Sequence, residues 1–171
     1  DFIMQTPNDF FMYRDFQSRN IMIKDNHTYF IDYQGGRKGP LQYDVVSLLY
    51  QVKAQLPQSL RDDLLCHYKQ RLSTILDIKE LCFDEYYQAF VLLRMMQVLG
   101  AYGYRGLIQK KQHFLSSIPY ALKELSVLND RLDLPLEIKE LSSVLSQLKY
   151  LIKKYEPSEE DEELLVNHIP T

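Results

Sequence analysis

The stretch FMYRDFQSRNIMIKDNHTYFIDYQGGRKGP, residues 11–40, decides the fold of this chain. It contains two short apolar runs, residues 21–23 and 29–31, separated by polar residues that favour turns. Two such runs around a turn predict a tight antiparallel β-hairpin. The hairpin would bring Asn20, just before its first strand, beside Asp32, just after its second strand.

The polar residues of this stretch follow a spacing that suits phosphoryl transfer. Four residues separate Asp15 from Asn20, and Asp32 comes after the second apolar run. This order is typical of a kinase catalytic loop followed by a metal-binding aspartate. Oxygen ligands from Asn20 and Asp32 suit Mg²⁺, and Asp15 would accept the proton of an acceptor hydroxyl. Alternatively, Asp15 and Asn20 are ordinary turn residues and Asp32 caps a strand end; the three together favour the first interpretation.

Residues 13–20 (YRDFQSRN) and 31–34 (IDYQ) resemble the aminoglycoside phosphotransferase-like small-molecule kinases of the choline kinase superfamily. The resemblance continues through Gly39-Pro40 and Tyr43-Asp44. It implies binding of ATP and Mg²⁺, with Asp15 as the catalytic base and Asn20 and Asp32 as metal ligands. It also implies that Asp44 supports the loop through hydrogen bonds.

Several further residues are candidates on the same resemblance. Tyr13 stands where the family commonly has His, and we expect Tyr13 and Arg14 to support the loop. Gln17, Arg19 and Gln34 are candidate substrate-binding residues.

Residues 94–103 (RMMQVLGAYG) and a later Ile118-Pro119 step add a second resemblance, to the bacterial cell-wall amino-sugar 1-kinases. It implies that Arg94 and Tyr102 border the acceptor pocket and that the acceptor is a sugar or amino sugar. The alternative is that Arg94 and Tyr102 pack structurally, as long amphipathic side chains commonly do.

Composition bounds the class of protein. With 171 residues and 46% hydrophobic content, the chain can bury the core of one domain. A net charge of -3 gives no basic footprint for nucleic acid or for an anionic membrane. No apolar run is long enough to span a membrane, and no leader is recognisable, so we expect a soluble, cytoplasmic protein. We expect Cys66 and Cys82 to be buried, reduced thiols because each lies in an apolar helical context.

From Leu41 onward the pattern predicts helices. One begins at Leu41, and a second has Ser59 as its N-cap and a stripe of Leu60, Leu64, Tyr68 and Leu72. Others cover residues 84–102 and the segment after Ser117, and a last helix opens at Pro135. The last helix would dock by one face or bind a partner. The segment 35–40 is predicted to be a flexible connector that would either approach a phosphate or form a solvated turn.

The expected fold is α+β and mainly helical: a kinase C-terminal lobe over residues 1–155 whose small β-hairpin carries the catalytic loop. The chain contains neither a Gly-rich phosphate loop nor a Val-Ala-Ile-Lys-like strand, so we expect the N-terminal lobe to belong to a longer protein. Residues 156–171 would form an acidic linker and the entry to a possible fused domain.

The predicted function is ATP-dependent phosphorylation of a small-molecule hydroxyl, with this fragment inactive alone. The alternative is a catalytically inactive, kinase-like binding or regulatory module.

Overall fold

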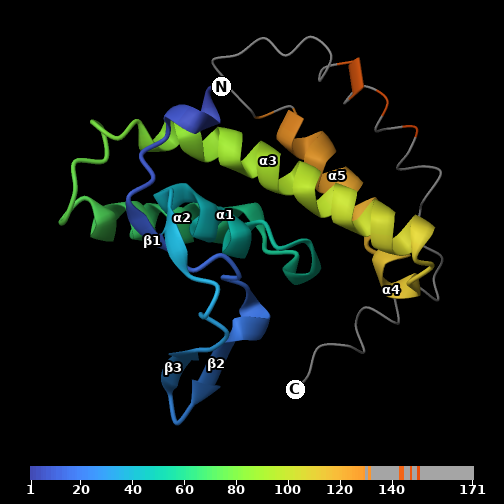
Figure 1. The fold of residues 1–171 in the computed structure, drawn as a ribbon, viewed down its shortest axis with the longest axis horizontal. Coiled ribbons are helices and arrows are strands. Elements are labelled where there is room, and N and C mark those ends of the chain that lie inside the picture. Colours follow the sequence, from blue (N-terminus) through green and yellow to red (C-terminus); the bar gives the residue numbers. More distant parts are fainter. Residues whose placement is uncertain (130, 132–142, 145–146, 148–149, 151–171) are drawn as a thin grey trace. The chain divides into compact units, whose positions relative to one another are not determined.

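The computed structural model describes residues 1–129, 131, 143–144, 147 and 150 (Figure 1). The chain divides into two compact units, residues 1–94 and 95–171, which are described separately below. The described structure is mainly helical and holds two small sheets, which agrees with the predicted α+β class. None of the helices in the described ranges combines the length and apolar character needed to cross a membrane.

The predicted hairpin is present in the first unit. Strand β2 (Ile21–Lys24) pairs antiparallel with β3 (His27–Phe30), and the register sets Ile21 opposite Phe30. The connecting residues Asp25 and Asn26 have φ values of 49° and 62°. Two consecutive positive φ values are what a two-residue hairpin turn requires, and Asp and Asn tolerate them well.

A second sheet corrects the prediction for residues 35–40. Strand β4 (Arg37–Gly39) pairs antiparallel with β1 (Phe10–Met12), so this segment is not a flexible connector throughout. Gly39 permits the pairing because a Cβ built on it would lie 2.7 Å from Sδ of Met12. The close approach of the two strands therefore depends on the missing side chain.

Helix α1 (Leu41–Leu49) begins where it was predicted, directly after Pro40. Its buried side chains include Val45, Val46 and Leu49, which contribute to the core of the first unit. Short 3₁₀ turns lie at Ile3–Gln5, Ser18–Asn20 and Val52–Ala54.

Helix α2 (Gln58–Leu72) differs from its prediction at both its start and its apolar face. Its N-cap residue is Pro57 rather than Ser59, and the Gln58 side chain donates a hydrogen bond to Asp62 at 2.7 Å. Of the predicted stripe, Leu72 is buried and Tyr68 is half-buried. Leu60 and Leu64, however, are 41% and 42% exposed, so the N-terminal half of the stripe is not covered by the described residues.

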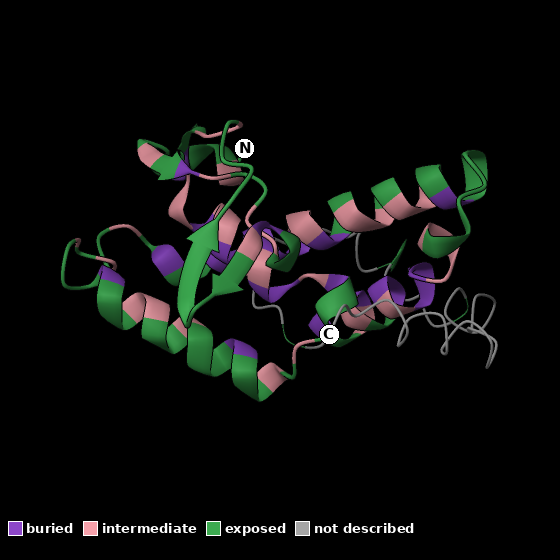
Figure 2. Cartoon of the chain, turned by 90° about the horizontal axis from the view of Figure 1, so that it is seen from below, coloured by how far each residue is buried: buried purple, intermediate pink, exposed green. Residues whose placement is uncertain are grey.

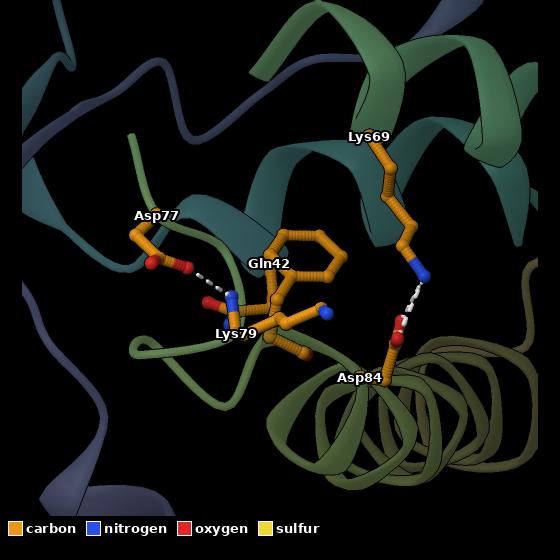
Figure 3. Close-up of polar contacts among 6 residues, drawn as sticks. Gln42, Lys69, Asp77, Lys79 and Asp84 are labelled. Carbon is orange, nitrogen blue, oxygen red and sulfur yellow. Dashed lines mark hydrogen bonds and ion pairs between the residues drawn. The ribbon is translucent and has the colours of Figure 1, made fainter. Parts of the chain in front are cut away.

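Helix α3 (Phe83–Gly103) matches the prediction for residues 84–102 to within a residue at each end. Its first residue, Phe83, is buried, and its carbonyl accepts a hydrogen bond of 3.5 Å from the Gln42 side chain. Asp84 forms an ion pair of 2.6 Å with Lys69 of α2, as Figure 3 shows. The Asp77 side chain accepts the backbone N–H of Lys79 in the preceding turn, also visible in Figure 3.

The prediction that both cysteines are buried is wrong, because Cys66 and Cys82 are exposed. Cys66 lies within α2. Cys82 occupies the turn just before α3, with a φ of 45°. An apolar context in the sequence therefore did not indicate burial at either position.

The second unit contains the end of α3, a π-helical turn η4 (Tyr104–Ile108), α4 (Gln112–Leu115) and α5 (Ile118–Asn129). The helix predicted after Ser117 is present as α5 and buries four large apolar side chains, and the one-sided burial of the helices is visible in Figure 2. They are Ile118, Leu122, Leu125 and Leu128. Met95 is also buried, whereas Met96 is 50% exposed. The predicted helix from Pro135 and the acidic residues 159–163 lie outside the described residues.

Candidate active site

The predicted catalytic residue, Asp15, lies in the exposed loop between β1 and the 3₁₀ turn Ser18–Asn20. Its carboxylate accepts a hydrogen bond of 3.2 Å from the Gln17 side chain. Its backbone carbonyl accepts one of 2.8 Å from the side-chain amide of Asn20. Because Asn20 is only 5% exposed, this bond ties the loop to a buried anchor.

Asn20 also connects the loop to the hairpin. Its backbone carbonyl accepts a hydrogen bond of 3.0 Å from the N–H of Ile31, one pair beyond the last pair of the β2–β3 ladder. Asn20 and Asp32 therefore both lie at the open end of the hairpin. The side-chain oxygen of Asn20 has no hydrogen-bond partner among the described residues, so it remains available as an oxygen ligand.

The carboxylate of Asp44, in the first turn of α1, holds the start of the loop. Asp44 accepts the backbone N–H of Tyr13 at 2.5 Å and that of Arg14 at 2.9 Å. Burial raises the pKa of Asp44, and these two hydrogen bonds oppose that effect by favouring the charged form. The arrangement is the kind of loop support that the resemblance implies for Asp44.

Tyr13 connects the loop to the segment that carries Asp32. Its hydroxyl donates a hydrogen bond to the backbone carbonyl of Ile31. Burial, and next the carboxylates of Asp32 and Asp15, raise the pKa of this phenol. Tyr13 therefore remains protonated at neutral pH and can serve as a donor.

Two non-glycine residues of the site have left-handed backbone conformations. Arg14 has a φ of 79° and Asp32 a φ of 66°. Such conformations cost free energy and concentrate at functional sites. The Arg14 guanidinium donates a hydrogen bond of 3.4 Å to the carbonyl of Gly35, and Gln34 donates to the Asp32 carboxylate.

A polar cavity of about 230 Å³ brings the two predicted catalytic carboxylates together. Its lining residues are Tyr13, Arg14, Asp15, Asp32, Gln34, Gly35 and Tyr43. Tyr43 was not proposed from the sequence as a site residue, and its position directly before Asp44 is the signal that pointed to it. Gln51 was also missed: its side chain accepts the backbone N–H of Ser18 at 3.0 Å.

The other candidates lie outside this cavity. Arg19 is exposed on the 3₁₀ turn, and Gln17 donates to the Asp15 carboxylate without lining the cavity. Arg94 is half-buried with an unpaired Nε in the described structure. Tyr102 packs its ring 5.6 Å from that of Phe114 in the second unit. A role for these residues in acceptor binding remains a prediction.

The described residues contain no group of three or more His, Cys, Asp or Glu side chains placed to hold a metal ion. Mg²⁺ does not need such a group, because it keeps several waters and takes ligands from substrate phosphates. The carboxylate of Asp32 and the unpaired side-chain oxygen of Asn20 are hard oxygen donors of the kind that Mg²⁺ prefers. Asn20 and Asp32 thus have the donor chemistry of a magnesium site, although Asn20 does not line the cavity that Asp15 and Asp32 share.

Comparisons with known proteins place this geometry in context. Residues 4–81, which include every residue lining the polar cavity, match the model of the Ecdysteroid kinase-like family. Over 119 residues the chain is 29% identical to an N-acetylmuramate/N-acetylglucosamine kinase from Neisseria meningitidis serogroup B. That match covers 67% of this chain but only 35% of the length of the Neisseria enzyme.

Proposed function

Because this chain is related to the kinase-like small-molecule phosphotransferases, we propose that its parent protein transfers the γ-phosphoryl group of ATP to a hydroxyl of a sugar or amino sugar. The observation that supports this most directly is the polar cavity shared by Asp15 and Asp32. Two carboxylates in one small cavity are what phosphoryl transfer needs for its base and a metal ligand, and the backbone of Asp15 is held by a hydrogen bond from Asn20.

Asp15 is the proposed base. Its exposed carboxylate can approach an acceptor hydroxyl, while the bond from Asn20 to its carbonyl restrains the loop. A general base acting on the acceptor hydroxyl contributes roughly 10²- to 10⁴-fold in rate. The remaining acceleration would come from positioning and from neutralising the charge of the transferred group.

Asn20 and Asp32 are the proposed ligands of Mg²⁺. When bound, the ion would neutralise negative charge on the nucleotide phosphates. Asn20 keeps its side-chain oxygen unpaired by using its amide hydrogens elsewhere. Gln34 and the left-handed backbone at residue 32 orient the Asp32 carboxylate. The amino-sugar acceptor is proposed on the name of the Neisseria relative and on the resemblance of residues 94–103.

The test is ATP consumption by the full-length protein against amino sugars, simple sugars and aminoglycosides in the presence of Mg²⁺. We expect turnover with an amino sugar or sugar, and a loss of roughly 10²-fold or more in Asp15→Asn. Asp25→Asn, the same substitution in the exposed hairpin turn, is the matched control and should keep full activity. Absence of Mg²⁺-dependent nucleotide binding would instead favour a catalytically inactive regulatory module.

A further inference from the structure

An exposed turn in the second unit combines apolar and basic side chains. It follows α3 and includes the π-helical turn η4. Its apolar members are Tyr104, Leu107 and Ile108, which are 58%, 42% and 68% exposed. Its basic members, Arg105, Lys110 and Lys111, are exposed as well. These six residues are called the basic apolar turn below.

A hydrogen bond and close packing fix the backbone of this turn, and this fixed backbone leaves its apolar side chains exposed. A π-type hydrogen bond of 3.1 Å joins the N–H of Gln109 to the carbonyl of Tyr104. Gly106 is buried, and a Cβ on it would lie 2.9 Å from Cδ2 and 3.1 Å from the backbone N of Leu115. Leu115 therefore packs directly on the backbone at Gly106, while Leu107 and Ile108 remain outside. Short π-helical segments are frequent at functional sites.

The cations of the turn have no acidic partner within the described structure. The Arg105 guanidinium lies 5.2 Å from the centre of the Phe114 ring, and none of the three cations forms an ion pair there. Residues 95–129 contain four basic residues and one acidic residue, which gives 4 − 1 = +3 with His neutral. An apolar patch rimmed by charge of one sign marks an interaction surface. Its partner should be acidic and should carry apolar side chains.

One segment of the same chain has this composition. Residues 159–163 are EEDEE and are followed directly by Leu164, Leu165 and Val166. Residues 157–171 contain five acidic residues and no Lys or Arg, which gives 0 − 5 = -5. The segment 159–166 thus matches the basic apolar turn in charge and in apolar content.

The covalent connection also permits the contact. Residue 159 follows residue 129, the end of α5, by 159 − 129 = 30 positions. A segment of that length reaches about 45 Å if it is wholly helical, as the prediction from Pro135 favours for much of it, and up to about 100 Å if it is extended. A tethered segment acts at an effective concentration on the order of millimolar, so weak contacts suffice.

We propose that residues 159–166 dock on the basic apolar turn of the same molecule. The acidic residues would pair with Arg105, Lys110 and Lys111, and the apolar residues would cover Tyr104, Leu107 and Ile108. This intrachain interface is independent of the proposed kinase activity.

The chain contains no tryptophan, so Ile108→Trp in the full chain creates a single fluorescent reporter in the turn. With residues 159–163 unchanged, we expect the emission of this reporter to be blue-shifted because the docked segment shields it. When residues 159–163 are neutralised to Gln and Asn, acrylamide quenching should rise roughly threefold. High salt should produce part of the same increase, because it screens the ion pairs. In a second variant, Leu164→Ser with Leu165→Ser should raise quenching without changing charge.

Ile75→Trp is the matched control, because Ile75 is 78% exposed and lies in the first unit. Its quenching should not respond to either change. Equal responses of the two reporters, or no response of Ile108→Trp, would overturn the proposal. Protection that appears only as protein concentration rises would assign the surface to a second copy, and would overturn the intrachain contact too.

Charge exchange provides a further check on the same reporter. Lys110→Glu with Lys111→Glu should expose the reporter, and adding Glu159→Lys with Glu160→Lys should restore protection. Circular dichroism should show unchanged helix content in each variant. Failure of the exchange to restore protection in folded protein would contradict docking through these charges.

Discussion

The Asp44 carboxylate accepts the backbone N–H of Arg14 at 2.9 Å, and Arg14 has a left-handed φ of 79°. Asp44 and Arg14 are 30 residues apart in the sequence. A hydrogen bond from helix α1 therefore stabilises the unfavourable left-handed backbone of Arg14. A strained backbone of this kind persists only when its surroundings determine it. The geometry of the loop at Asp15 should therefore depend on Asp44, which need not contact the substrate.

Asp44→Asn should lower turnover more than it lowers stability. The amide keeps one acceptor but presents an N–H₂ group to one of the two backbone donors, so one hydrogen bond is lost and a donor is left unpaired. We expect a loss of roughly 10²-fold in kcat, because small displacements of catalytic groups have effects of this size. Nucleotide turnover and urea unfolding of the same preparation would measure both effects. An equally large loss of activity in Asp25→Asn would show that the effect is unspecific.

The pH dependence of stability should carry the signature of Asp44. Its pKa is raised in the folded state, mainly by burial, so protonation at this group favours the fold. Its stabilising contribution is present below the unfolded value near 4 and is lost as pH rises through the raised value. The stability of the wild type relative to Asp44→Asn should therefore fall from pH 4 upward. Urea unfolding across this range measures the difference, and a rise with pH would contradict the burial effect.

Tyr13→Phe should separate the hydroxyl of Tyr13 from its ring. The substitution removes the hydrogen bond to the carbonyl of Ile31 but keeps the ring packing on Phe16, whose centre is 5.6 Å away. One such bond contributes about 0.5–1.5 kcal/mol, so we expect a loss of up to roughly tenfold in kcat. Tyr29→Phe, at a 52% exposed hairpin position, is the control. Unchanged kinetics in Tyr13→Phe would mean that the loop does not need this connection to the Asp32 segment.

The hairpin and the helices were predictable because their signals are local. The apolar runs around a turn indicated β2 and β3, and regular spacing indicated α1, α3 and α5. Strand β4 was missed because it pairs with β1, from which it is separated by the whole hairpin, and two glycines in sequence resemble a linker. The exposure of Leu60, Leu64 and Cys66 also depends on what lies next to α2, and that of Cys82 on the turn before α3, neither of which periodicity specifies.

The candidate site was predictable to a similar degree. Spacing alone suggested Asp15, Asn20 and Asp32, whereas the role of Asp44 came only from the resemblance, because its hydrogen bonds span 30 and 31 residues. Tyr43 lines the cavity because it lies in the first turn of α1. In the sequence, a tyrosine in an apolar helical pattern is typical of a packing residue and not of a site residue.

A pair of glycine substitutions should test how β1 and β4 support the loop. In Gly39→Ala the new Cβ would lie 2.7 Å from Sδ and 3.0 Å from Cβ of Met12, so the strands must separate or Met12 must move. Overpacking of this kind costs about 1–3 kcal/mol. Gly100→Ala, inside α3 with no atom within 4 Å of the new Cβ, should instead stabilise the helix by about 0.5–1 kcal/mol. Urea unfolding would measure the stability of both variants. Adding Met12→Ala to Gly39→Ala should relieve the clash, while leaving a smaller cost from the lost Met12 side chain. If Gly39→Ala is neutral by itself, the pairing of β1 with β4 does not depend on the close approach at Gly39. The loop that carries Tyr13 and Asp15 would then be held by the hydrogen bonds of Asp44 and not by this pairing.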